Sequence, residues 1–238
     1  MDQSRPFNRG LAFKAEVVLA SLLVVRHRAP RFALLLAAGI LAILVLDDSP
    51  DAFLVRRNGL ALVAGLLAAV SAARVLARGG ALASVRGLPS HPYVSPAGRL
   101  TAVVVFVVFP LAAASVLLVA SRWGVVQAGQ VLICASLPAV ALASILMALT
   151  PLTGATTATV SGILASVLGG IPPADMASAL ASWPLIRDLA LAAWEILPLA
   201  WRAGQWFDHG GLWHPLVLSA WIVAGAAMAP LTIRVRLR

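Results

Sequence analysis

Hydroxyl side chains gather at one place within an otherwise apolar stretch of this sequence: Thr153, Thr156, Thr157, Thr159 and Ser161. A nucleophilic serine or threonine needs a base beside it, and in hydrolases the serine often stands in a G-x-S-x-G motif. Neither that motif nor a histidine occurs in this stretch. Two interpretations stay open. The hydroxyls either bond their own helix backbone and ease helix packing, or line a polar translocation path.

The four histidines give little support for metal or haem chemistry. They all lie in predicted loops or at the edges of apolar tracts: His27, His91, His209 and His214. A haem held between membrane helices needs axial ligands within those helices, so none is expected. Asp208 with His209 and His214 could ligate a metal, but a solvated polar turn explains them equally well. We therefore predict no metal site.

Two further classes of chemistry are absent from the sequence. Cys134 is the single cysteine and lies in an apolar tract, which rules out an intrachain disulfide and a cysteine metal cluster. No G-x-x-x-x-G-K-[ST] phosphate-binding loop occurs, so we expect neither ATP hydrolysis nor a cofactor on this chain. The chain is not predicted to be an enzyme.

The composition places these residues in a membrane protein. Of the residues, 61% are hydrophobic and 11% are charged, with a mean hydropathy of +0.95. A soluble domain is about one-quarter charged, and this chain could not cover itself with polar surface. The net charge of +9 is explained by basic residues that flank membrane spans rather than by nucleic-acid binding.

Long uncharged tracts predict an all-α, polytopic membrane protein with a single transmembrane domain over residues 1–238. Six tracts are expected to span the bilayer: residues 32–47, 58–77, 100–121, 127–149, 155–171 and 215–233. Residues 124–174 carry no charge and are too long for one helix. The Pro-Gly break in Thr150-Pro151-Leu152-Thr153-Gly154 divides them into two.

The charges predict the orientation. With six spans, one side holds most of the basic residues: Arg5, Arg9, Lys14, Arg26, Arg28, Arg31, Arg74, Arg78, Arg86, Arg99, Arg234, Arg236 and Arg238. The other side holds most of the acids and most of the tryptophans. Basic loops stay in the cytoplasm, and tryptophan favours the membrane interface. We therefore expect a multi-pass protein of the cell inner membrane with both termini cytoplasmic.

Three segments lie outside the predicted spans. Residues 10–27 have helical composition and few charges, which favours a helix in the cytoplasmic interface, although a buried helix or a seventh span stays open. Residues 78–99 form a basic cytoplasmic loop with a short helix-capable piece. Residues 172–214 are expected to pack into the outer leaflet as short broken helices, with an interruption at Pro198.

This order of elements resembles the permease subunit of ABC-2 type exporters. In the loop, Gly80-Ala81-Leu82 and Leu88-Pro89 followed by Gly98-Arg99-Leu100 are similar to the family pattern around its coupling helix. Residues 195–202, EILPLAWR, are similar to the leucine-proline stretch before the last span. The sequence departs from the family in one respect. Arginines stand where many members carry an acid near the start of the loop.

The resemblance implies a permease dimer, of identical or different chains, engaged by a cytoplasmic ATPase that binds ATP and Mg²⁺. Residues 10–27 would form an elbow helix. The docking surface for the ATPase would include Arg78, Gly80, Leu82, Arg86, Leu88 and Pro89. An outer gate would include Glu195, Pro198, Trp201 and Arg202. The apolar spans suit an amphipathic or lipid-like cargo, and membrane lipid is the surrounding partner.

Two alternatives from other classes stay open. A structural or assembly subunit of a larger membrane complex would need only helix packing and no gate. A membrane-embedded lipid-modifying enzyme would need polar groups near an interface, for which only loop residues such as His91, Asp208 and His214 are available.

Overall fold

The structure is a computed structural model, and the residues it describes are 9–26, 28, 31–32, 35, 38–39, 57, 59, 61–72, 94–114, 117, 119–120, 124–197 and 201–236. Within these residues every regular element is a helix. The all-α prediction is therefore confirmed for this part of the chain. Most of the first predicted span, residues 32–47, and most of the loop 78–99 lie outside the described residues.

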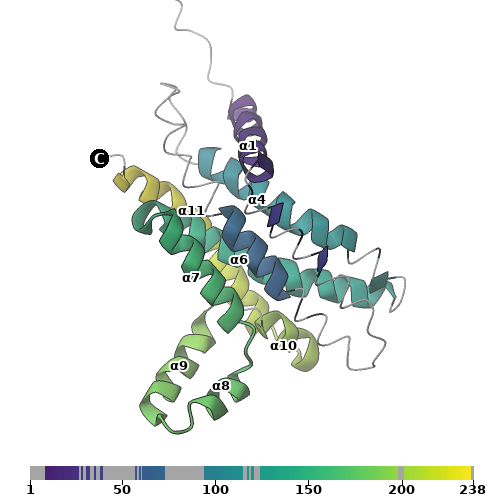
Figure 1. The fold of residues 1–238 in the computed structure, drawn as a ribbon, viewed down its shortest axis with the longest axis vertical. Helices are drawn as coiled ribbons and strands as arrows, with labels where there is room; N and C mark the ends of the chain where they lie inside the picture. Colours follow the sequence, from purple (N-terminus) through teal and green to yellow (C-terminus); the bar gives the residue numbers. More distant parts are fainter. Residues whose placement is uncertain are drawn as a thin grey trace, which may run out of the picture.

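Helix α6 (Val125–Thr153) is the centre of the fold. It packs against α4 (Val94–Ala114), α7 (Ala155–Leu168), α10 (Trp201–His209) and α11 (Trp213–Arg236), as Figure 1 shows. Most of its buried side chains are small, among them Ala135, Ala139 and Ala143. Small side chains let helix backbones approach closely, so α6 can contact several neighbours along its length.

Two glycines mark the closest helix crossings. A Cβ on Gly225 of α11 would lie 2.5 Å from the backbone carbon of Ser144 on α6. A Cβ on Gly162 of α7 would lie 2.7 Å from the Cβ of Ala69, which belongs to the apolar helical stretch Ala61–Ala72. Neither contact is compatible with a larger residue unless the helices separate.

Helix α1 (Arg9–Arg26) packs along α4, with Ala20 and Val24 buried in the main core. Arg99 of α4 lies 3.7 Å from the Glu16 carboxylate of α1, and both side chains are largely buried. Such a pair favours the register in which the two side chains meet. Arg99 stands within a helix that begins at Val94, inside the segment predicted as a loop.

Gly154 separates α6 from α7. Its φ of +87° lies in the left-handed region, and its amide donates to the Thr150 carbonyl at 2.9 Å. Helix α6 runs through Pro151 and ends at Thr153, so the glycine conformation is what ends the helix. The next helix, α7, has 14 residues and ends at Leu168.

Two helices in the described part of the chain are long and apolar enough to cross a membrane, Val125–Thr153 and Trp213–Thr232. A third candidate is α7 together with α8 (Pro173–Ala179), a pair bent by 96°. Ala61–Ala72 and Ala97–Phe106 are shorter apolar helices. Two or three apolar helices are thus compatible with membrane insertion.

Between α7 and α11 the chain forms three short helices, α8, α9 (Pro184–Ile196) and α10. Figure 1 shows α8 and α9 as a hairpin that projects from the bundle, while α10 returns to it. Helix α9 has no buried residue. It exposes Leu185, Ile186, Leu189 and Ile196. We call α8 and α9 the projecting hairpin.

Candidate functional site

The C-terminal end of α9 is where the projecting hairpin joins the bundle. The helix stops at Ile196 because Leu197 precedes a proline and adopts an extended conformation, with φ −72° and ψ 148°. The last carbonyl groups of a helix have no partner within it and must find donors elsewhere. Here the donors come from α10 and α11.

Arg202 supplies two of these donors. Its Nη2 donates to the Trp194 carbonyl at 2.7 Å, and its Nε donates to the Leu197 carbonyl at 2.8 Å. On α11, Trp221 Nε1 donates to the Ile196 carbonyl at 2.6 Å. The Arg202 side chain is fully buried. A cation at a helix C-terminus also interacts favourably with the negative end of the helix dipole.

The remaining contacts of Arg202 are electrostatic and aromatic. Its Nη2 lies 3.8 Å from the Glu195 carboxylate, and its guanidinium carbon lies 4.9 Å from the centre of the Trp201 ring. Nη1 lies 3.3 Å from His214 Nδ1, which accepts because a guanidinium only donates. Burial lowers the pKa of Arg202, and the Glu195 charge opposes that shift. We call these six residues the Arg202 cluster: Trp194, Glu195, Leu197, Trp201, Arg202 and His214.

Two further hydrogen bonds connect the turn after α7 to the same region. Trp194 Nε1 donates to the Ile171 carbonyl at 3.2 Å, and the Trp201 amide donates to the Gly169 carbonyl at 3.1 Å. The Trp194 side chain is thus held at its indole nitrogen, while its backbone is held by Arg202. The bond at the indole nitrogen and the bond at the backbone carbonyl together fix the position of the Trp194 ring.

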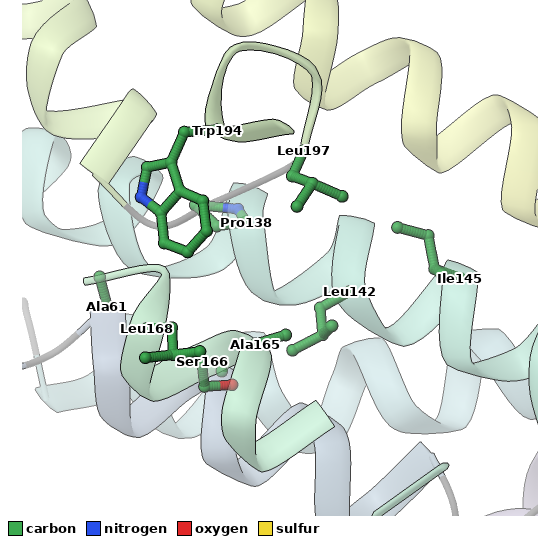
Figure 2. Close-up of a pocket in the computed structure, with 10 residues that line it drawn as sticks. Ala61, Pro138, Leu142, Ile145, Ala165, Ser166, Leu168, Trp194 and Leu197 are labelled. Carbon is green, nitrogen blue, oxygen red and sulfur yellow. The ribbon is translucent and has the colours of Figure 1, made fainter. Parts of the chain in front are cut away.

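Directly beside this cluster is an apolar cavity of about 220 Å³. Figure 2 shows the ring of Trp194 and the side chain of Leu197 on one side, with residues of α6 and α7 opposite. The lining residues come from four parts of the chain: Ala61, Gly65, Pro138, Leu142, Ile145, Ala165, Ser166, Leu168, Trp194 and Leu197. Arg202 bonds the backbone of both Trp194 and Leu197, so the cluster positions one wall of the cavity.

The polar atoms in this wall already have partners. Ser166 Oγ donates to the Gly162 carbonyl at 2.8 Å, and the Trp194 indole nitrogen bonds Ile171. A cavity with such a lining favours an apolar guest. An engineered apolar cavity of about 150 Å³ binds benzene or xenon, so this one is large enough for part of a hydrocarbon.

The structure brings together three of the four predicted gate residues, Glu195, Trp201 and Arg202; Pro198 lies outside the described residues. The five hydroxyl residues of the predicted translocation path are not among those that line this cavity. Thr153 and Thr159 donate to backbone carbonyls of their own helices, at 3.2 and 2.7 Å. Three others are exposed along α7: Thr156, Thr157 and Ser161.

The predicted docking surface for an ATPase lies outside the described residues. This applies to all six of its residues: Arg78, Gly80, Leu82, Arg86, Leu88 and Pro89.

Sequence patterns did not indicate that Trp194, His214 and Trp221 would meet at the end of α9, because these residues belong to different elements. Among the described residues no group of three or more His, Cys, Asp or Glu side chains could hold a metal ion. No family model, curated protein or solved structure matches the chain.

Proposed function

We propose that this chain is the membrane-spanning permease subunit of an ATP-driven ABC exporter. It would move an amphipathic or lipid-like substrate by alternating access coupled to a separate ATPase. The observation that carries the proposal is the broken helical segment α8–α10 between α7 and α11, in which the C-terminal end of α9 is bound by the buried Arg202. This arrangement supports an outer gate.

The mechanical argument follows from how the segment is attached. Helix α9 has no buried face, but its last carbonyl groups are bound by Arg202 and Trp221. A helix held at one end can move with α10 and α11 while its free face follows the surrounding lipid. Movement of the last span would thereby be transmitted to the outer segment.

The proposed topology has six spans, with both termini in the cytoplasm and the chain in the cell inner membrane. The long helices α6 and α11 and the bent pair of α7 with α8 supply up to three of them. Ala61–Ala72 and Ala97–Phe106 belong to two more. The tract at residues 32–47 would supply the remaining one.

A dimer of permease chains is part of the proposal. Helix α7 exposes the hydroxyl side chains of Thr156, Thr157 and Ser161. Polar side chains in a membrane helix favour contact with protein or a water-filled path over contact with lipid. A second chain against this face would cover them and would place them beside a translocation path.

A pulldown tests the proposal. The tagged chain is purified from membranes of its native host in mild detergent, and bound proteins are identified by mass spectrometry. We expect the wild-type chain to retain a protein with a Walker A motif. The double variant Leu88→Asp with Pro89→Asp should no longer retain it. The matched control is His91→Asp with Tyr93→Asp, which adds the same two charges to the same loop outside the docking residues. Retention of the ATPase by both variants would argue against this docking site, and its absence from the wild type would overturn the exporter proposal.

A structural or assembly subunit is the second candidate, and the exposed apolar face of α9 favours it. Leu185 and Leu189 are 74% and 64% exposed, which is unusual for leucines on a helix outside a span. A stable integral partner could cover this face. The same pulldown decides between the two, because this candidate predicts integral membrane partners and no ATPase.

A further inference from the structure

The cavity beside the Arg202 cluster is continuous with an apolar stripe on one face of α6. On α6 its wall is formed by Pro138, Leu142 and Ile145, which lie on one helix face. The same face continues to Leu149 and Leu152, which are 39% and 54% exposed. From Pro138 to Leu152 a helix rises by about 20 Å. An apolar stripe therefore begins inside the cavity and ends at exposed residues on the surface of the bundle.

The two ends of this stripe differ in exposure. Pro138, Leu142 and Ala61 are buried and form the closed end. Leu197 lines the cavity and is 36% exposed, and Leu149 continues the stripe at 39% exposure, so the cavity opens on this side. The surface next to the opening on α7 is also apolar, with Leu164 exposed. A guest can thus enter from the side, through apolar surroundings.

We propose that this cavity binds one acyl chain of a membrane lipid, which enters between α6 and α7 with its methyl end beneath Trp194. A linear hydrocarbon fits an elongated apolar stripe better than a compact solute does, and lipid is the apolar solvent at the opening of a membrane-inserted helix. The described wall offers no free polar atom, so recognition rests on the chain and not on the headgroup. The proposal goes beyond the exporter function and requires no ATPase.

Trp194 has a particular role in this site. Its ring forms the upper wall in Figure 2, and its position is fixed by Arg202 at the backbone and by Ile171 at the indole nitrogen. The occupied cavity would therefore contact the helix end through which the projecting hairpin is attached. An acyl chain in this position packs directly against the wall that the Arg202 cluster holds.

The test is photo-crosslinking in membranes that contain the full-length chain with its natural partners. The probe is a single-chain phospholipid with a diazirine at the end of its acyl chain, and labelled peptides are mapped by mass spectrometry. We expect label on peptides that contain Leu142, Ala165 or Trp194. Ala165→Phe fills the cavity and should reduce that label about tenfold, because the probe loses most of its buried contact area.

Matched variants separate cavity binding from general lipid contact. Val160→Phe adds a ring to the same helix at a position that is 52% exposed, and it should leave cavity label unchanged. Ala61→Leu narrows the opposite wall and serves as a second filling variant if Ala165→Phe does not fold. Label at exposed Val223 on α11 reports lipid contact in every sample. Probes with phosphocholine and phosphoglycerol headgroups should label equally.

Three results would overturn the proposal. The first is cavity label no stronger than label at Val223. The second is cavity label that survives both filling variants. The third is label that depends on the headgroup, since the wall has nothing to recognise one. None of these results bears on the ATPase pulldown, so failure of the lipid site and failure of the exporter proposal are distinguishable.

Discussion

Helices α6 and α9 both carry apolar residues, but they are held in the molecule in opposite ways. Helix α6 has buried residues along nearly its whole length, from Ala128 to Thr150. Helix α9 has none. It is attached through its last carbonyl groups, which Arg202 and Trp221 bind. One helix is fixed by packing over its faces and the other by hydrogen bonds at its end.

The difference shows what each region can do. A helix packed on several sides cannot move without opening the core, since interiors are close-packed. A helix attached at one end can change its angle at the cost of a few polar contacts. The bundle around α6 therefore provides the rigid part, and the projecting hairpin provides a part that can move.

The largest difference in the free energy of unfolding is expected between variants of one leucine in α6 and one leucine in α9. Leu146 of α6 is 2% exposed, and Leu146→Ala should lower the free energy of unfolding by about 3 kcal/mol because it leaves a cavity. Leu189→Ala on α9, at a position 64% exposed, should change it by less than about 0.5 kcal/mol. Chemical unfolding in detergent measures both. Equal losses would show that α9 is packed after all.

Loss of the hydrogen bonds that Arg202 makes at the end of α9 should lower the free energy of unfolding nearly as much. Arg202→Met leaves the carbonyl groups of Trp194 and Leu197 without donors in a buried site, which should cost about 2 to 3 kcal/mol. Hydrogen exchange should rise in α9 while α6 stays protected. The control is Arg187→Met, which removes an exposed ion pair with Asp188 on α9 and should have little effect. Faster exchange throughout α6 would contradict local attachment.

Close approach of α6 and α11 can be tested at one glycine. Gly225→Ala places a Cβ against the Ser144 backbone and should cost about 1 to 2 kcal/mol through forced separation of the helices. Gly129→Ala on α6 meets no atom within 4 Å and is the matched control. The midpoint of thermal unfolding compares the two variants. If Gly225→Ala unfolds at the temperature of the control, the helices are not in close contact there.

The smallest effect is expected at the contact of α1 with α4. Glu16→Gln removes the charge that faces Arg99 at 3.7 Å and should cost about 1 kcal/mol, because the pair is long and both side chains keep some exposure to solvent. Protease cleavage between α1 and the bundle should become faster, while the α9 attachment is unchanged. A variant as stable as the wild type would indicate that apolar packing alone holds α1.

Several features of the fold follow from local sequence. Long uncharged tracts favour helices, and Gly154 occurs where the chain turns between α6 and α7, since glycine adopts a positive φ without strain. The broken character of residues 172–214 is evident from its prolines. The apolar content of α6 and α11 is enough to indicate membrane spans. Their number stays a prediction, because much of residues 32–60 lies outside the described residues.

The candidate site was only partly predictable. Glu195, Trp201 and Arg202 lie close together in sequence, and a resemblance to a leucine-proline stretch singled them out. Their partners Trp221 and His214 lie on another helix, and no spacing rule connects them to α9. The cavity is harder still to predict, because Ala61, Leu142, Ala165 and Trp194 are ordinary apolar residues until packing brings them together.

By itself the sequence determined that this protein is helical, apolar and suited to a membrane, because composition and hydropathy act locally and add along the chain. The tertiary structure decided which arginines are buried, which carbonyl groups Arg202 binds and where a cavity remains between α6 and α7. These features depend on the relative positions of residues far apart in the chain. Those positions are set by how small side chains allow the helices to approach.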